Sequence, residues 1–363
     1  MTGPEARPPP LAEQVLERGH EMRTTLARAA AMLPLRPDGQ AAETFMELPP
    51  ARILRYPAAN AGRAMAPVLI IYSMINRPYL LDLQPRRSVI RHLTQAGADV
   101  YVLDWGEPAA LDRDLDMEEC IGEFVRTAVS AIRAAHEGSR LNVAGICQGG
   151  TMAVCHAALH PESVQSLANF AGPVDFHTPD NTLWRLTRDL DPELLAHSPG
   201  NLPSAALNAV FVGLKPLRLL DQRYFAMPEL CRDDDALADF LRMERWMYDS
   251  PNQPAAAVRT FIRDFYQRNA LYKGELRIQG RSVDLRAITM PLFNAYARDD
   301  HLIPAAAAQA LERRAGSNSI HSQPFPGGHL GLFVSARAHR EVYPRYLEWL
   351  HSHGSRAAAM AAR

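Results

Sequence analysis

The sequence predicts an α/β fold in which helices cover both faces of a mostly parallel sheet. Between about residues 51 and 171, short apolar runs alternate with segments of helical periodicity. The alternation resumes near residue 290, after a helix-rich stretch that interrupts it. Strands that alternate with helices in this way are joined by crossover connections, which place them parallel to one another in one sheet.

Composition narrows the class of protein. The 363-residue chain has 39 basic and 40 acidic residues, so no overall field favours nucleic acid or an anionic membrane. Its four cysteines show neither metal-ligand spacing nor a disulfide-rich pattern, which favours a reducing cytoplasm. The N-terminus lacks a secretory core, and the most apolar run, residues 66–75, is too short to cross a bilayer. We therefore expect a soluble cytoplasmic protein with no nucleic-acid partner, no bound metal and no transmembrane segment.

The first half of the chain contains an arm and then the alternating elements. Residues 1–10 are proline-rich and are expected to be disordered. The next residues predict a helix with one apolar face, which comprises Leu11, Val15, Met22, Leu26 and Leu33. This helix is expected to dock on its own domain or, in a second interpretation, on a partner. Strands are predicted at residues 51–56, 67–73, 99–104, 141–147 and 166–171, and helices at 86–95, 117–136 and 149–159.

The second half begins with an insertion. Residues 174–284 are rich in helical pattern, with few strand patterns before 275–283, and indicate a cap over the carboxyl edge of the sheet. Later elements are predicted as strands at 290–296 and 320–325, helices at 305–315 and 338–351, a helix stop at Gly354 and a frayed tail at 356–363. The predicted division is an arm at 1–40, a core at 41–173 and 285–363, and a cap subdomain at 174–284.

A turn in the segment 141–152 carries the first functional motif. Gly145-x-Cys147-x-Gly149 has the spacing of a nucleophile elbow, in which small residues let a strand turn sharply into a helix and expose the central side chain. Most cysteines are small buried hydrophobes, and Cys120 and Cys155 are assigned to the core on that ground. The assignment of Cys147 as a nucleophile therefore depends on partners elsewhere in the chain.

Those partners follow in the order typical of the α/β-hydrolase fold, which is nucleophile, acid and histidine. The predicted strand at 290–296 leads to Asp299 and Asp300, and the next strand leads to His329 between small residues. The pattern does not decide whether Asp299 or Asp300 is the acid. His301 is the competitor of His329, with a packing or hydrogen-bonding role as its simpler interpretation. The sequence thus predicts a catalytic triad for acyl transfer that needs no metal.

Acyl transfer also requires hydrogen-bond donors for the oxyanion that forms on the substrate carbonyl. The backbone N–H of Gln148, at the start of the elbow helix, is the first predicted donor. A second is expected in the loop after the strand at 67–73, near Ile75 or Asn76.

Several longer motifs resemble those of the polyhydroxyalkanoate synthases, and among these the short class III catalytic subunit. The motifs are Ser73-Met-Ile-Asn-Arg-Pro-Tyr-Leu-Leu-Asp-Leu-Gln84, Asp99-Val-Tyr-Val-Leu-Asp-Trp-Gly106, Gly145-Ile-Cys-Gln-Gly-Gly150, Trp246-Met-Tyr-Asp-Ser-Pro251, Lys273-Gly-Glu-Leu276, Asp300-His-Leu-Ile-Pro304 and Gly327-Gly-His-Leu-Gly331. They extend over roughly residues 50 to 350. The proline-rich N-terminus and Arg77-Pro78 do not match features of that family.

The resemblance implies a substrate and a choice of acid. The family's aspartate directly precedes the His-Leu-hydrophobic-Pro run, which here is Asp300. The implied reaction transfers an (R)-3-hydroxyacyl group, such as 3-hydroxybutyryl, from coenzyme A to Cys147 and then to the hydroxyl of a growing polyester, with no further cofactor. His329 would deprotonate Cys147 and activate the hydroxyl, and Asp300 would orient His329 or act on the hydroxyl more directly. The family also implies an E-type accessory subunit, a homodimer or hetero-oligomer, and association with polyester granules.

Two other functions remain open at the level of sequence. A cysteine-dependent hydrolase of esters or thioesters, similar to the dienelactone hydrolases, would use water as the acceptor. A catalytically inactive scaffold that binds granules is the alternative from a different class of protein.

Overall fold

The structure, a computed structural model, describes residues 11–33, 35, 37–60, 65–197, 200–214 and 223–353. The predictions for residues 1–10, for Gly354 and for the tail at 356–363 lie outside these residues.

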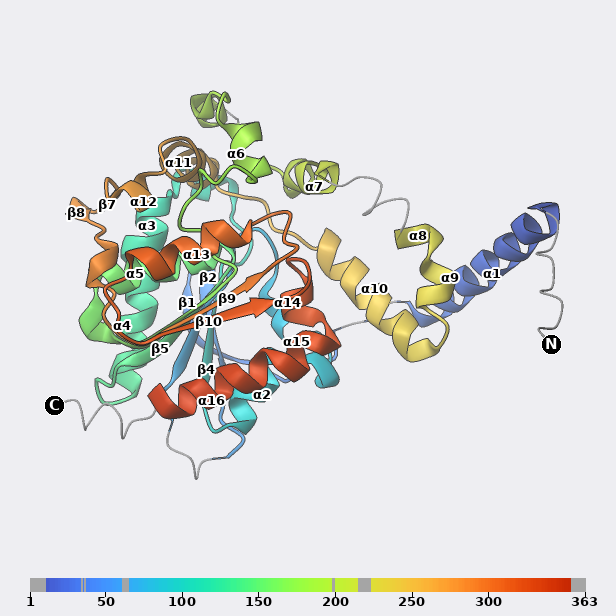
Figure 1. Ribbon diagram of the computed structural model, residues 1–363, viewed down its shortest axis with the longest axis horizontal. Helices are drawn as coiled ribbons and strands as arrows, with labels where there is room; N and C mark the ends of the chain where they lie inside the picture. Colours follow the sequence, from blue (N-terminus) through green and yellow to red (C-terminus); the bar gives the residue numbers. More distant parts are fainter. Residues whose placement is uncertain are drawn as a thin grey trace, which may run out of the picture.

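An eight-stranded sheet forms the centre of the described chain (Figure 1). Its order is β1-β2-β4-β3-β5-β6-β9-β10, and all neighbours are parallel except the pairs β1–β2 and β2–β4. The strands are β1 (Glu43–Leu48), β2 (Ala51–Tyr56), β3 (Val68–Ile71), β4 (Val100–Asp104), β5 (Leu141–Ile146), β6 (Val164–Phe170), β9 (Leu292–Ala297) and β10 (Ile320–Phe325). The mostly parallel sheet confirms the predicted fold class, and β1 is the strand that the sequence pattern missed.

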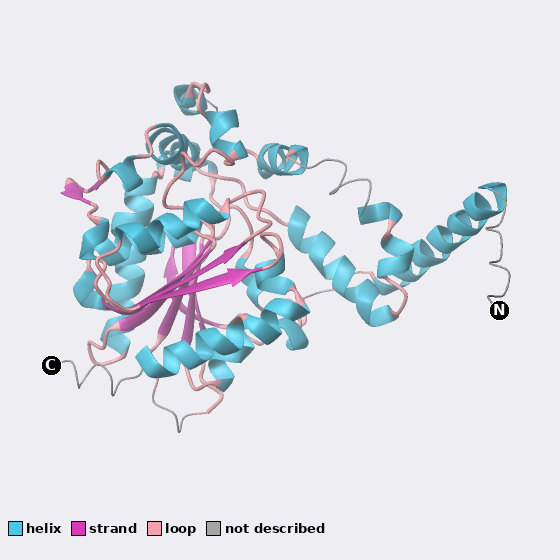
Figure 2. Cartoon of the chain, in the orientation of Figure 1, coloured by secondary structure: helices cyan, strands magenta, loops and turns pink. Residues whose placement is uncertain are grey.

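Helices cover both faces of this sheet, so its central strands are buried on both sides (Figure 2). One apolar cluster joins the sheet to α4 (Arg126–Ala135), α5 (Gln148–Leu159) and α13 (Ala305–Arg314). A second cluster joins the opposite face to α2 (Val89–Gln95), α14 (Gly331–Val334), α15 (Ala336–Glu341) and α16 (Tyr343–His353). Cys120 and Cys155 are fully buried in the first cluster, which confirms their assignment to the core.

Two predicted helices are interrupted in the structure. The helix predicted at 117–136 consists of α3 (Met117–Glu119), a π-helical segment (Cys120–Val125) and α4. The helix predicted at 338–351 is divided between α15 and α16. Pro344 lies in the first turn of α16, where its missing N–H costs no hydrogen bond, so the second helix begins there.

The segment between β6 and β9 contains helices and loops and one small hairpin, which lie above and beside the carboxyl ends of the strands in Figure 1. Its described elements are α6 (Thr182–Thr187), a 3₁₀ turn (Pro192–His197), α7 (Ser204–Gly213), α8 (Arg223–Phe225), α9 (Met227–Leu230), α10 (Asp234–Tyr248), α11 (Ala255–Thr260), a π-helical segment (Phe261–Gln267), α12 (Ala270–Lys273), β7 (Arg277–Ile278), β8 (Arg281–Ser282) and a second 3₁₀ turn (Leu285–Ala287).

Helix α1 (Leu11–Met32) projects from the body of the molecule and packs on α9 and α10 (Figure 1). Its buried side chains include Thr25 and Ala29, and Ala29 belongs to a small cluster with Met227, Cys231 and Leu237. The helix was predicted, but Leu26 and Leu33 of the predicted apolar face are 52% and 59% exposed, so this face does not dock on the chain's own domain. The side chains of Leu11 and Val15 lie outside the described part.

Polar contacts explain why the docked face of α1 escaped the apolar pattern. Arg28 binds Asp234 at 2.7 Å, and Arg18 binds Glu229 at 2.8 Å. A small residue, Ala29, allows the helices to approach closely between these ion pairs. A search for large apolar residues at helical spacing therefore selects the other side of the helix.

Candidate active site

Cys147 occupies a sharp turn between β5 and α5. Its backbone has φ +54° and ψ −123°, which is an unfavourable conformation for a residue with a side chain. Its N–H donates to the carbonyl of Phe170 at 2.9 Å, and its carbonyl accepts from Gly150 N–H at 2.8 Å. A Cβ at Gly149 would lie 2.6 Å from the carbonyl oxygen of Tyr72, so glycine is required there. The turn thus holds the thiol at the carboxyl edge of the sheet.

Asp300 and His329 meet because β9 and β10 are parallel neighbours and their following loops lie at the same edge. Asp300 Oδ2 is 2.6 Å from His329 Nδ1. Asp300 Oδ1 accepts from the backbone N–H groups of Leu302 and Ile303, both at 2.9 Å. The carboxylate is fully buried and the imidazole side chain is only 6% exposed, so the pair is shielded from water.

The two charges of this pair stabilise each other. Burial alone would raise the pKa of Asp300, but the charge and hydrogen bond of His329 lower it below its usual range. Burial alone would lower the pKa of His329, but the charges of Asp300 and Cys147 raise it well above its ordinary value. His329 is also hydrogen-bonded to the side chain of Cys147. The structure therefore places Cys147, His329 and Asp300 in one chain of contacts.

The competing candidates were Asp299 and His301. Asp299 is exposed, and its backbone N–H donates to the carbonyl of Gly327 at 2.9 Å. His301 lines the same cavity as His329, and the ion pair at 2.6 Å joins Asp300 to His329.

The predicted oxyanion residues line the same cavity as Cys147. Gln148 begins α5, where the first backbone N–H groups have no partner within the helix. Its side-chain Oε1 accepts from Met74 N–H at 3.2 Å. Ile75 N–H donates to Ser73 Oγ at 3.2 Å, and the Asn76 amide donates to Ser250 Oγ at 2.7 Å. Their role as oxyanion donors stays a prediction.

These residues open into a cavity of about 660 Å³. It is lined by Cys147, Gln148, Ile75, Asn76, His301 and His329, and by apolar side chains from α6, α7 and the π-helical segment 261–267. The apolar contributors from the segment between β6 and β9 include Leu183, Leu186, Leu190, Leu194, Leu207, Val210, Phe211, Trp246, Met247, Phe261 and Ile262. Such a lining suits an acyl chain more than a charged substrate.

Three cavity residues were missed by the sequence patterns. Tyr72 and Tyr266 are buried, and burial followed by the charge of Cys147 raises the pKa of both phenols. Gln253, 3% exposed, bonds to the carbonyl of Met74. Tyr72 was detectable from its place at the end of a predicted strand, whereas Tyr266 and Gln253 reach the site only through the fold.

The described residues contain no group of three or more His, Cys, Asp or Glu side chains suited to hold a metal ion. Within the same part of the chain, no helix is long and apolar enough to span a bilayer.

Comparison with known proteins supports the observed fold. A family model described as the alpha/beta hydrolase fold matches residues 66–336. The monoacylglycerol lipase of Paleococcus ferrophilus covers 85% of this chain and 100% of its own, with a TM-score of 0.52 and 16% identity. A soluble variant of the Saccharomyces cerevisiae monoglyceride lipase covers 89% and 98%, with a TM-score of 0.53 and 14% identity. At such identities the likeness concerns the fold alone.

Curated relatives share far more of the sequence. The poly(3-hydroxyalkanoate) polymerase subunit PhaC of Allochromatium vinosum is 42% identical over 284 residues, or 78% of this chain and 80% of the relative. The protein of the same name from Synechocystis sp. is 40% identical over 293 residues, or 78% of this chain and 77% of the relative. The likeness covers more than three quarters of each chain.

Proposed function

This chain belongs to the family of PhaC subunits of poly(3-hydroxyalkanoate) polymerases, and from that premise we propose how its site carries out the polymerisation. The resemblance to polyhydroxyalkanoate synthases is thereby confirmed, and the protein is an acyltransferase. The observation that carries the proposal is the buried pair of Asp300 and His329 in contact with Cys147 on its strained turn.

The first half-reaction loads the enzyme. His329 takes the thiol proton of Cys147, and the resulting thiolate attacks the thioester carbonyl of an (R)-3-hydroxyacyl-CoA. The N–H of Gln148 and a donor from the loop at Ile75 and Asn76 stabilise the oxyanion. When the carbonyl re-forms, the CoA sulfur leaves and receives the proton from His329. One thioester replaces another, so the step is close to isoenergetic.

The second half-reaction extends the polyester. His329, oriented by Asp300, accepts the proton of a 3-hydroxyl group as that oxygen attacks the acyl group on Cys147. The ester forms, and the Cys147 sulfur leaves as a thiolate beside protonated His329. The apolar cavity walls favour this outcome over hydrolysis because they hold acyl groups and offer few polar partners to water.

Incubation with 3-hydroxybutyryl-CoA tests this function against its alternatives. We expect CoA release together with insoluble polyester. Release of free 3-hydroxybutyrate instead would identify a thioester hydrolase. A Cys147→Ala variant that still releases CoA at the full rate would contradict a nucleophilic role for Cys147. The interpretation of the protein as a catalytically inactive, granule-binding scaffold would then have to be considered again.

The assembly follows from the class III resemblance. The relatives are named as subunits, and we assign to this chain an E-type accessory subunit, a homodimer or hetero-oligomer, and a cytoplasmic location on polyester granules. Helix α1 is the proposed contact, because Leu16, Leu26 and the adjoining Leu33 are each more than half exposed. Deletion of residues 1–35 is expected to abolish co-purification with the accessory subunit, and unaltered co-purification would contradict this contact.

The division of the chain follows the same proposal. We assign residues 1–40 to an arm, 41–173 and 285–363 to the catalytic core, and 174–284 to a cap subdomain. The cap assignment is supported by the apolar side chains that this segment contributes to the cavity above Cys147.

A further inference from the structure

Residues 246–253, which we call the bridging segment, comprise the end of α10 and most of the connection to α11, and they contact the loop after β3. That loop, residues 73–79, contains the predicted oxyanion residues Ile75 and Asn76 and is called here the oxyanion loop. Four hydrogen bonds join the two: Trp246 Nε1 to Arg77 O at 2.8 Å, Tyr79 Oη to Asp249 Oδ2 at 2.9 Å, Asn76 Nδ2 to Ser250 Oγ at 2.7 Å, and Gln253 Nε2 to Met74 O at 2.7 Å.

The last of these bonds controls the direction of a backbone N–H. A trans peptide is planar, and its C=O and N–H point in opposite directions. The peptide whose carbonyl belongs to Met74 carries the N–H of Ile75. Because Gln253 holds the carbonyl, it also fixes the orientation of the predicted donor. Gln148 Oε1 holds the preceding peptide through Met74 N–H at 3.2 Å, so both peptides of Met74 are constrained.

The amide of Gln253 is itself held in place. Its backbone forms two hydrogen bonds with Leu202, N–H to carbonyl at 2.9 Å and carbonyl to N–H at 2.8 Å. Its Nε2 also lies 3.2 Å from the carbonyl of Pro251 within the same turn. The residue is 3% exposed, so water does not compete for the bond to Met74.

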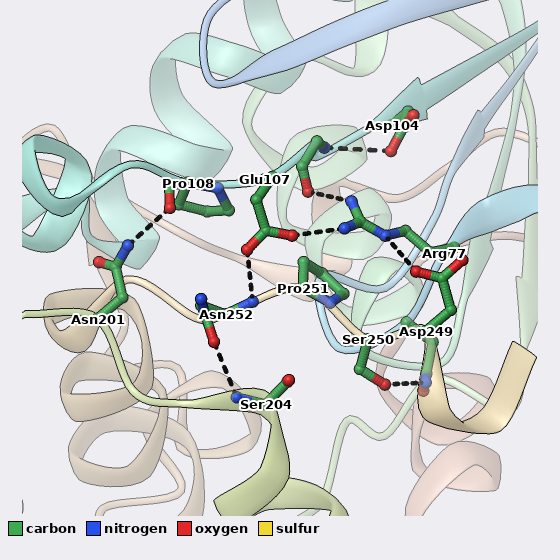
Figure 3. A network of polar contacts seen from close by, with 12 residues as sticks. Arg77, Asp104, Glu107, Pro108, Asn201, Ser204, Asp249, Ser250, Pro251 and Asn252 are labelled. Carbon is green, nitrogen blue, oxygen red and sulfur yellow. Dashed lines mark hydrogen bonds and ion pairs between the residues drawn. The ribbon is translucent and has the colours of Figure 1, made fainter.

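A network of charges fixes the bridging segment against the core (Figure 3). Arg77 of the oxyanion loop lies between Glu107 and Asp249 and donates to the carbonyl of Gly106 at 2.7 Å. Glu107 in turn accepts from the backbone N–H of Asn252 at 3.1 Å. The segment next to Gln253 is thus tied to the loop after β4 as well as to the oxyanion loop.

We propose that Gln253 is a positioning residue for acyl transfer, an inference that rests on the proposed function. Its amide sets the Met74–Ile75 peptide so that the Ile75 N–H faces the oxyanion of the Cys147 adduct. The bridging segment belongs to the insertion over the sheet, so the oxyanion donor is complete only when that segment lies on the core. Before substrate binds, the donor's hydrogen bond goes to Ser73 Oγ.

Two reactions of Cys147 in the full-length protein distinguish a loss of oxyanion stabilisation from a general disruption of the active site. Acylation by 3-hydroxybutyryl-CoA passes through an oxyanion before CoA leaves. Alkylation by iodoacetamide is a direct displacement of iodide by the Cys147 sulfur and forms no oxyanion. The other three cysteines are buried, so alkylation reports on Cys147. We expect Gln253→Leu to lower kcat for acylation about 10²-fold at nearly unchanged KM, with an unchanged rate of alkylation.

Asn252→Ala is the matched control, because the Asn252 side chain accepts from Ser204 N–H within the insertion and does not contact the oxyanion loop among the residues that the structure describes. It is expected to retain both rates. If Gln253→Leu slows both reactions equally, or slows neither, the proposal is overturned. A wild-type protein that is alkylated at Cys147 but releases no CoA contradicts the proposed function instead.

A second variant tests the hydrogen bond itself and keeps the side chain polar. In Gln253→Glu, the protonated carboxyl group can donate to the carbonyl of Met74, whereas the ionised group cannot and repels it. Burial raises the pKa of such a carboxyl group. We expect the acylation rate of this variant, relative to wild type, to rise as the pH falls. A ratio that is independent of pH would overturn the proposal even if Gln253→Leu fails to fold.

Discussion

At the scale of single residues, the proposed chemistry depends on three side chains that follow three parallel strands of the sheet. Cys147 depends on the turn after β5, where φ is +54° and glycines are needed nearby. Asp300 depends on His329 and on two backbone N–H donors, which keep its carboxylate ionised although burial favours the protonated form. His329 depends on Asp300, whose position against Nδ1 leaves the other ring nitrogen for Cys147.

Replacing Asp300 tests its proposed role as the acid that orients His329. Asp300→Asn retains a side chain of the same size but removes the charge that favours the imidazolium and the correct tautomer. We expect the rate of acylation by 3-hydroxybutyryl-CoA to fall about 10³- to 10⁴-fold. Single-turnover release of CoA provides the measurement.

Asp299→Asn is the control for that substitution. The two aspartates are adjacent, but Asp299 is exposed and does not form the ion pair with His329. The control is expected to retain the wild-type rate. A large loss in Asp299→Asn, or a small loss in Asp300→Asn, would show that the acid was assigned to the wrong residue.

At the scale of elements, α1 is held by a narrow contact and not by a broad apolar face. Ala29 packs into the cluster formed by Met227, Cys231 and Leu237, flanked by the ion pairs of Arg18 and Arg28. Exposed ion pairs contribute little to stability, about 0–1 kcal/mol each. The small apolar cluster therefore provides most of the docking energy, and a single substitution there is enough to disturb it.

Ala29→Arg is expected to release α1 from α9 and α10, because a long charged side chain does not fit among these apolar residues. Hydrogen exchange within α1 should become faster, and limited proteolysis should cut there first. Ala30→Arg places the same side chain on the exposed side of the same helix and is expected to change neither measurement. Equal protection of α1 in both variants would contradict the assigned docking face.

At the scale of the whole molecule, the buried pair of Asp300 and His329 links stability to pH. The raised pKa of His329 contributes stability that is complete below its ordinary value of about 6.5 and is lost as the pH rises through the folded-state value. The lowered pKa of Asp300 contributes stability that is complete above about 3.9 and is lost as the pH falls through the folded-state value. The two windows overlap between about pH 4 and 6.5.

We therefore expect His329→Gln to destabilise the protein most within this window, by about 2 kcal/mol. The loss of unfolding free energy relative to wild type should become smaller at higher pH, because the imidazolium of folded wild type loses its proton. It should also become smaller at lower pH, because Asp300 is protonated. Urea unfolding at a series of pH values measures it. His351→Gln, on the exposed side of α16, controls for loss of an imidazole. If the free energy of unfolding of wild type and variant differed by an amount that increases steadily with pH, the assigned direction of the His329 pKa shift would be contradicted.

Much of the fold was predictable because it rests on patterns within short windows. Apolar runs and helical periodicity located seven of the eight strands of the sheet, and β1 was missed because its apolar alternation is weak and none of its residues is buried. The split between α15 and α16 was missed because the apolar pattern continues across Pro344, although a proline is best accommodated in the first turn of a new helix.

The sequence by itself determined that Cys147 lies on a strand-to-helix turn and that Asp300 and His329 follow later strands, because turn geometry and element order are local properties. Only the tertiary structure decided which side of α1 docks and that Gln253 holds the carbonyl of Met74, 179 residues away. Such contacts depend on how distant elements pack against one another. A hydrogen bond to a backbone carbonyl leaves no pattern around either residue, so only the assembled fold reveals it.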